Sequence, residues 1–182
     1  MTLLAMGQDQ REVVLVNKRF LTEVYGERDV MMFNHSLEHV ADSAAGLTAV
    51  ASRLVLGGLC FVRIPTTSSE AWELYGADWV RIDAPRHVFV PSRRGMARLA
   101  KRVGLVLERA IDDSTAFQFI GSEFYGKGVP LFRESNGTLR ASAAESHFSR
   151  KEIRRWVRRS AELNAAGRGD QCAFLLRNAP EV

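Results

Sequence analysis

Short apolar runs rich in valine, methionine and phenylalanine mark the first third of the chain. They cover residues 12–16 (EVVLV), 29–33 (DVMMF) and 59–64 (LCFVRI). None alternates cleanly between apolar and polar positions, which is typical of strands covered on both faces. Between the second and third runs, apolar residues of 47–54 recur at helical spacing, so we expect a helix over 37–54 with Gly57 as its C-cap. A strand, a helix and a strand in this order predict a parallel βαβ unit.

Helix and strand signals alternate again in the second half of the chain. Ser92 and Ser149 are good N-caps, and Gly104 is a good helix end. The expected elements are helices over 93–103 and 150–164 and strands over 105–111 and 171–177. The last two elements are joined by a glycine-rich turn over 167–170, a connection that commonly adds an antiparallel strand to a parallel sheet. We therefore expect an α/β fold with a mainly parallel sheet and an antiparallel edge strand.

Two segments resist assignment to regular elements. Residues 66–91 form a long stretch after the 59–64 strand, and such a stretch is usually functional or carries a small helix. It contains Trp72, Tyr75 and Trp79. We expect these side chains to anchor the loop in the core, and the alternative is a platform that contacts the substrate. Residues 114–148 hold several glycines and Pro130, and we interpret them as an insertion or a lid.

Length and composition indicate one ordinary globular domain. The chain has 182 residues, 46% of them hydrophobic, and a net charge of +4. Much of the positive charge lies in arginine pairs on one helical face, which favours a solvated face over a nucleic-acid interface. Cys60 and Cys172 have no metal-ligand spacing and are expected to be buried free thiols. With no signal peptide or membrane-spanning stretch in the sequence, we expect a cytoplasmic protein.

Four motifs in order carry a resemblance to a known family. They are DVMMFNHSLEHV (29–40), LVLGGLCFVRIP (54–65), WVRIDAPRHVF (79–89) and GDQCAFLLR (169–177). Together they resemble the class I S-adenosylmethionine-dependent methyltransferases, over nearly all of residues 12–178. The resemblance implies a Rossmann-like sheet, S-adenosylmethionine as cofactor and a small-molecule methyl acceptor.

The sequence departs from this family at its N-terminal end. The family has a Gly-x-Gly-x-Gly loop after its first strand and an acidic residue that holds the ribose, and we find neither in this sequence. We therefore expect residues 1–182 to form a single, incomplete methyltransferase domain that binds S-adenosylmethionine weakly or not at all. The alternative is a non-catalytic Rossmann-like remnant or a partner-binding module.

Polar residues follow the 29–33 strand at what should be the carboxyl edge of the sheet, where α/β proteins bind ligands. We expect Asn34, His35, Ser36 and Leu37 to contact the cofactor. If a helix begins near His35, then His35, Glu38 and His39 share one side of it. Some members of the family bind a divalent metal through a Glu-x-x-Glu-His arrangement at this place, but His35 replaces the first glutamate here. We therefore favour no metal. The structural interpretation is a helix N-terminus at which Glu38 favours the positive end of the helix dipole and His39 packs locally, and the functional one is a catalytic position for His39 beside the methyl-transfer centre.

The loop after the 59–64 strand supplies the other catalytic candidates. His87 could act as a general base, and Arg86 could hold an anionic acceptor through a bidentate contact. The structural alternative is an ion pair between Asp83 and Arg86 that fixes the turn around Pro85.

The absence of the family's first strand affects the oligomeric state that we expect. In the family, the 29–33 strand is central, so without that neighbour it would present unpaired backbone groups at an edge. Such an edge should accept residues 12–16 of the same chain or a second copy of the protein. We favour a homodimer, because apolar surface on the sheet would otherwise remain uncovered.

Overall fold

The computed structural model describes residues 13–15, 26–135 and 138–179. The strands are β1 (Val13–Leu15), β2 (Arg28–Asn34), β3 (Leu54–Pro65), β4 (Leu105–Asp112), β5 (Phe132–Ser135), β6 (Thr138–Ala141) and β7 (Gln171–Asn178). The α-helices are α1 (Ser43–Ala51), α2 (Glu70–Tyr75), α3 (Arg93–Arg102), α4 (Phe117–Gly126) and α5 (Arg150–Ala165). The 3-10 helices among the described residues are η2 (Leu37–His39), η3 (Gly76–Asp78) and η4 (Ala144–Ser146).

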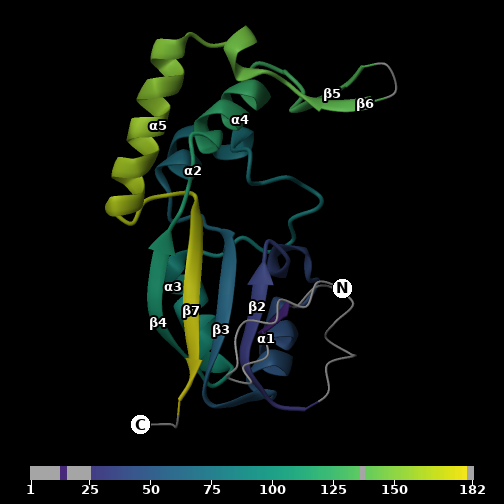
Figure 1. Ribbon diagram of the computed structural model, residues 1–182, viewed down its shortest axis with the longest axis vertical. Helices are drawn as coiled ribbons and strands as arrows, with labels where there is room; N and C mark the ends of the chain where they lie inside the picture. The colour runs from purple at the N-terminus through teal and green to yellow at the C-terminus, as the bar shows by residue number, and fades with distance from the viewer. Residues whose placement is uncertain (1–12, 16–25, 136–137, 180–182) are drawn as a thin grey trace, which may run out of the picture.

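The sheet confirms the predicted fold class. Its strand order is β1-β2-β3-β7-β4, with β1, β2 and β3 parallel and β7 antiparallel to both β3 and β4. The reversed strand β7 thus lies one position inside the edge strand β4. Helices α1 and α3 lie against one face of this sheet, whereas α2, α4, α5 and the β5–β6 hairpin gather beyond the carboxyl ends of β2, β3 and β4 (Figure 1). The carboxyl ends of the strands, where α/β proteins bind ligands, therefore lie between the sheet and these elements.

The main hydrophobic core lies between the sheet and helices α1 and α3. Its strand residues are Met31, Phe33, Cys60, Val62, Ile64, Leu105, Cys172, Phe174 and Leu176, and its helix residues include Leu47, Val50, Met96 and Ala100. In β2 and β3 these buried residues alternate with half-buried ones, such as Met32 and Phe61. One face of these strands is therefore buried and the other is half-buried. The apolar runs predicted strands fully covered on both faces.

Local signals at the helix ends were confirmed where side chains act as caps. Ser92 accepts a hydrogen bond from the amide of Gly95 at 3.0 Å, and Ser149 forms a full capping box with Glu152. Gly104 follows α3 with a positive φ of 79°, a conformation that glycine adopts without steric cost.

The helix predicted over 37–54 is divided in two. Asp42 caps α1 by accepting a hydrogen bond from the amide of Ala45 at 2.8 Å, so the helix starts at Ser43, and the preceding residues form the separate η2 turn. The prediction that Gly57 caps this helix is wrong. Gly57 lies inside β3, near the irregularity in the β2–β3 pairing.

Strand β2 has a neighbour on each side. Residues Val13, Val14 and Leu15 pair in parallel with Val30, Met31 and Met32, so part of the predicted 12–16 strand takes the place beside β2. Residues 12 and 16 lie outside the described part of the chain. This pairing satisfies the edge of β2 within one chain, which is the first of the two expected outcomes. The homodimer, expected from uncovered apolar surface, stays a prediction.

Both cysteines are free and buried, as expected. Among the described residues, no helix has the length and apolar character needed to cross a membrane.

Candidate functional site

A pocket of about 270 Å³ lies at the carboxyl ends of β2 and β3. Three separate segments form its wall: the η2 turn, the loop that follows η3, and the chain from α4 to the start of β5. The lining residues are His35, Glu38, His39, Val80, Arg81, Asp83, Arg86, His87, Phe117, Tyr125, Leu131 and Phe132. Four of the residues singled out from the sequence, His35, His39, Arg86 and His87, therefore share one pocket.

His35 is fixed by hydrogen bonds at both ring nitrogens. Its Nε2 lies 2.9 Å from Nη1 of Arg63, and its Nδ1 lies 3.2 Å from Oε1 of Glu38. Because arginine only donates, Nε2 must accept, and Nδ1 then donates to the carboxylate. These two contacts orient the ring of His35, which bridges the end of β3 to the η2 turn.

The other cofactor-contact candidates differ in their access to solvent. Asn34 is exposed at the end of β2, and Ser36 is half-buried. Leu37 is completely buried in the main core, so its side chain does not face the pocket. Any contact of Leu37 with a ligand would have to use its backbone.

The η2 turn and the loop after η3 are bound to each other by hydrogen bonds. The amide of Val88 donates to the carbonyl of Glu38 at 2.8 Å. Nδ1 of His39 lies 2.9 Å from the carbonyl oxygen of Arg86, and Nδ1 of His87 lies 2.7 Å from that of Arg81. These contacts bring the two imidazole rings to a centroid distance of 4.9 Å.

Glu38 is the most deeply buried acid of this pocket. Its residue is fully inaccessible, and one carboxylate oxygen interacts with His35. The other oxygen, Oε2, is buried without a hydrogen-bond partner. One ligand atom each of Glu38, His39 and His87 lies within 4.8 Å of the other two, so a carboxylate and two imidazoles converge here.

Arg86 forms the ion pair that the structural alternative predicted. Its Nη2 lies 2.6 Å from Oδ2 of Asp83, and Asp83 raises the pKa of the guanidinium through this hydrogen-bonded contact. The Arg86 side chain is 72% exposed. Arg86 is therefore already engaged at the pocket mouth, and a second anion could reach it only beside Asp83.

The backbone is constrained at two of the pocket residues. Within the described residues, His35 (φ 48°) and Asp83 (φ 39°) are the non-glycine residues with positive φ. This region is sparsely populated by L-residues, although His and Asp tolerate it better than most. Such conformations often mark ligand-binding sites, and both lie at this pocket.

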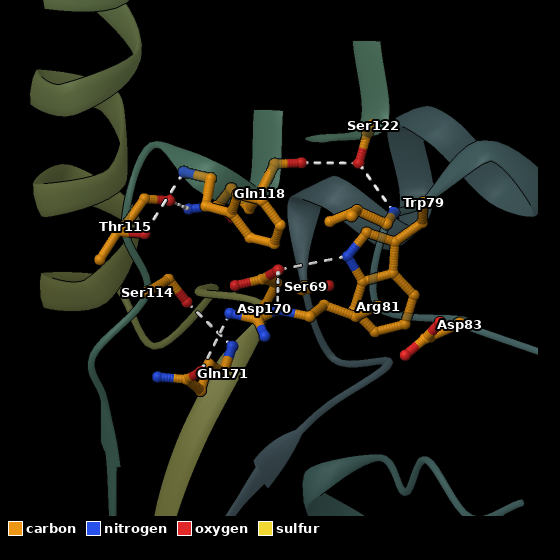
Figure 2. Close-up of polar contacts among 12 residues, drawn as sticks. Ser69, Trp79, Arg81, Asp83, Ser114, Thr115, Gln118, Ser122, Asp170 and Gln171 are labelled. Atoms are coloured by element: carbon orange, nitrogen blue, oxygen red, sulfur yellow. Dashed lines mark hydrogen bonds and ion pairs between the residues drawn. The ribbon is translucent and has the colours of Figure 1, made fainter. Parts of the chain in front are cut away.

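A buried aspartate anchors the loop from behind. Asp170, which is fully buried, accepts a hydrogen bond from Nε1 of Trp79 at 3.3 Å, and its Oδ2 lies 3.5 Å from Nε of Arg81 (Figure 2). Burial raises the pKa of the Asp170 carboxyl, whereas Arg81 opposes the rise. Nη2 of Arg81 also donates to Gln171 at 3.0 Å, which ties the loop to the start of β7.

Little in the sequence indicated this anchor or the part of the pocket wall formed by α4. From the sequence, Asp170 belongs to a turn and to one family motif and Arg81 to another motif, and neither has a predicted partner. Phe117 and Tyr125 belong to the segment interpreted as an insertion or lid, and they line the pocket. Whether that segment opens and closes stays a prediction. Of the aromatic residues singled out in 66–91, Trp79 is an anchor, since it is fully buried and packs edge-on against Trp72 at 5.7 Å, whereas Trp72 itself is exposed and Tyr75 is half-buried.

A second opening, of about 420 Å³, lies between α2, α4 and α5. Its charged residues are largely paired with one another, as in the contacts of Arg159 with Glu70 and Glu162. It contains none of the residues predicted for the site. We therefore take the smaller pocket at the strand ends as the candidate functional site.

Comparison with known proteins gives one family match. A family model described as a methyltransferase domain matches residues 7–110, more than half of the chain. A search of curated proteins gave no significant match.

Several solved structures have a similar fold. One is a SAM-dependent methyltransferase and possible histamine N-methyltransferase from Thermotoga maritima, with 15% identity, a TM-score of 0.49, and coverage of 86% of this chain and 58% of the other. Another is a putative sarcosine dimethylglycine methyltransferase from Galdieria sulphuraria (15% identity, TM-score 0.47, coverage 90% and 58%). A third is an O-methyltransferase of a polyketide synthase from Brevibacillus brevis in complex with S-adenosylhomocysteine (14% identity, TM-score 0.46, coverage 87% and 46%). The chain thus spans about half the length of these proteins.

Proposed function

Since this chain belongs to the methyltransferase domain family, we propose that the pocket at the carboxyl ends of β2 and β3 is the acceptor side of a methyl-transfer site that uses S-adenosylmethionine. The observation that carries the proposal is the convergence of His35, Glu38, His39 and His87 from two distant segments at one edge of the sheet. In α/β sheets this edge is where ligands bind. The acceptor we propose is a small molecule, because about 270 Å³ lies just below the roughly 300–1,000 Å³ of typical ligand pockets.

The described residues fit one end of S-adenosylmethionine better than the other. Exposed Asn34 at the end of β2 and the Asp113 carboxylate, which pairs with Arg63 near the end of β3, offer polar groups for an amino-acid moiety. The sequence contains no Gly-x-Gly-x-Gly loop for the nucleoside, so we propose weak cofactor binding by this chain. When bound, the cofactor would supply an electrophilic methyl group on a positively charged sulfur.

The protein's contribution would be mainly positioning. The Nδ1 atoms of His39 and His87 contact backbone carbonyls, so both Nε2 atoms keep a lone pair. A hydroxyl or amine of the acceptor that lies against these lone pairs can lose its proton to one of them. Phe117 and Tyr125 would enclose the acceptor from the α4 side and limit access of water.

Methyl transfer from methyl-labelled S-adenosylmethionine to a panel of small hydroxyl and amine compounds tests this proposal. We expect His87→Ala to abolish transfer while costing about 1–3 kcal/mol of stability, because the largely buried ring is lost and the carbonyl of Arg81 loses its donor. His147→Ala changes an exposed histidine away from the pocket and should retain transfer. Equal losses of activity and stability in His87→Ala would assign His87 to structure. Absence of both transfer and cofactor binding would favour the partner-binding alternative.

A further inference from the structure

Three potential metal ligands meet where the η2 turn contacts the loop after η3. They are one carboxylate oxygen of Glu38 and one ring nitrogen each of His39 and His87, all within 4.8 Å of one another. From their arrangement we propose that these three side chains bind one divalent transition-metal ion. The sequence alone favoured no metal, because His35 replaces the first glutamate of the Glu-x-x-Glu-His arrangement. The structure adds His87 to Glu38 and His39.

The carboxylate is placed as a ligand would be. Glu38 is fully buried, and its Oε1 is oriented by the Nδ1 hydrogen of His35. Its Oε2 has no hydrogen-bond partner. A buried carboxylate oxygen without a partner is unfavourable, and a cation at this point would compensate it. The unpartnered Oε2 is therefore an observation that points to a ligand independently of the histidines.

The two histidines are also oriented as metal ligands usually are. In metal sites, a histidine typically donates its second ring N–H to a backbone carbonyl or carboxylate, which fixes the tautomer. Nδ1 of His39 contacts the carbonyl of Arg86 at 2.9 Å, and Nδ1 of His87 contacts that of Arg81 at 2.7 Å. Both Nε2 atoms are consequently left as acceptors. The nearest carboxylate oxygen of Asp83 lies 3.8 Å from Nε2 of His87, which is too far for a hydrogen bond.

The set of ligands selects the class of ion. Two imidazoles and one carboxylate suit Zn²⁺, Co²⁺, Ni²⁺ or Fe²⁺, whereas Mg²⁺ and Ca²⁺ prefer oxygen ligands. Three protein ligands leave at least one coordination position for another molecule, as in catalytic zinc sites. All three side chains line the pocket, so this open position would face the space in which an acceptor could bind.

His35 is excluded from the site by its own contacts. Its two ring nitrogens are used by Arg63 and Glu38, so it offers no lone pair to an ion. In the proposed site His35 orients the glutamate, and it is not a ligand. This differs from the His35, Glu38 and His39 set that a continuous helix would have placed on one side.

The consequence for catalysis rests on the proposed function. An acceptor oxygen bound to the ion would be held at the pocket and would lose its proton more easily, because the ion stabilises the resulting anion. In the metal-bound protein, His39 and His87 would hold the ion and the proton of the acceptor would pass to water. Their role as bases in the proposed function applies to the metal-free protein. Metal binding itself does not depend on methyl transfer, so the two proposals can fail separately.

Titration of the untagged protein with Zn²⁺, followed by calorimetry, tests the inference, and Co²⁺ provides visible absorption bands that report its ligands. We expect one ion per chain in the wild type. Glu38→Gln and His87→Ala should each weaken binding about 100-fold or more, since loss of even an outer partner of a ligand costs about 10–100-fold. His147→Ala, the matched control for loss of a histidine, should bind as the wild type does.

Melting curves separate loss of a ligand from loss of the fold. Glu38→Gln retains the oxygen that accepts from His35, so its folded structure should persist. The proposal would be overturned by a wild-type protein that binds no Zn²⁺ or Co²⁺ at millimolar concentration. It would also be overturned by folded Glu38→Gln and His87→Ala variants that bind with unchanged affinity.

Discussion

Replacement of Arg81 by methionine tests the anchor behind the candidate site. Arg81 lies 3.5 Å from the carboxylate of the fully buried Asp170, donates to Gln171 and stacks over the ring of Phe117 at 5.3 Å. Its backbone carbonyl also receives the hydrogen bond from His87. Methionine keeps the length of the side-chain stem and removes every polar contact of the guanidinium.

The expected loss of stability follows from the burial of Asp170. Removal of one partner of a buried ion pair costs about 3–5 kcal/mol, because an uncompensated charge remains inside the protein. The Arg81 side chain is 21% exposed, and Trp79 still donates to the carboxylate, so we expect about 2–4 kcal/mol. This is a large part of the roughly 5–15 kcal/mol that stabilises a typical domain.

The loss should depend on pH in a defined direction. The pKa of Asp170 is already raised by burial, and it rises further without Arg81, which opposes that rise. In the folded variant the Asp170 carboxyl keeps its proton at pH values at which the unfolded chain, with a pKa near 3.9, has released it. The free energy of unfolding of the variant therefore falls as the pH rises from about 3.9 to the pKa of the folded state. Arg81→Met should therefore be more destabilising at about pH 7 than at about pH 4.5.

Urea unfolding followed by circular dichroism at the two pH values measures this difference. Asp170→Asn provides the control, since it removes the charge at nearly constant volume. In the Asp170→Asn background, Arg81→Met should cost much less than in the wild type. An equal cost in both backgrounds, or at both pH values, would refute the assignment of the loss to a buried charge.

Three further predictions concern the packing that supports the pocket. Gly121→Ala should cost about 1–3 kcal/mol in urea unfolding, because its Cβ would lie 2.6 Å from Cγ2 of Val80, whose amide is held by Ser122. The control Gly126→Ala, whose Cβ would meet only Oδ2 of Asp78 at 3.8 Å, should be stabilising by about 0.5–1 kcal/mol. Equal effects of the two substitutions would contradict the close contact between Gly121 and Val80. Burial raises the pKa of the Cys60 and Cys172 thiols to about 12, so the native protein should react slowly with a disulfide reagent at pH 8 and rapidly in urea. Fast native reaction of either thiol would show that it is accessible. Ser149→Ala removes the capping box of α5 and should cost about 1 kcal/mol in the same unfolding assay, and an unchanged midpoint would mean that the cap is energetically neutral.

The sequence predicted the parts of the fold that depend on local signals. Ser92 and Ser149 act through hydrogen bonds within one turn, so their positions identify helix starts directly. The apolar runs located β2, β3 and β7, because a buried strand needs continuous apolar character. The start of α1 was misjudged because Asp42 and residues 37–39 both fit a helix beginning, and only the cap at Asp42 is used.

The site was predictable only in outline. Parallel strands bring their carboxyl ends to one edge, which places His35, His39 and His87 in the same region. Their partners could not be predicted, since the contacts of His87 with Arg81 and of Arg81 with Asp170 span long separations or depend on the path of an irregular loop. The same applies to Phe117 and Tyr125, which reach the pocket only through the packing of α4 beyond the sheet.

The most direct test of the account is an NMR titration of the ¹⁵N-labelled protein with S-adenosylhomocysteine. The account predicts weak binding, with a dissociation constant of about 1 mM, or roughly −4 kcal/mol. It also predicts that the amide signals of Asn34, His35 and Ser36 shift most, because they stand at the carboxyl end of β2 beside the proposed acceptor pocket. Shifts confined to the opening between α2, α4 and α5, or no shift at several millimolar ligand, would contradict the placement of a methyl-transfer site at this edge of the sheet.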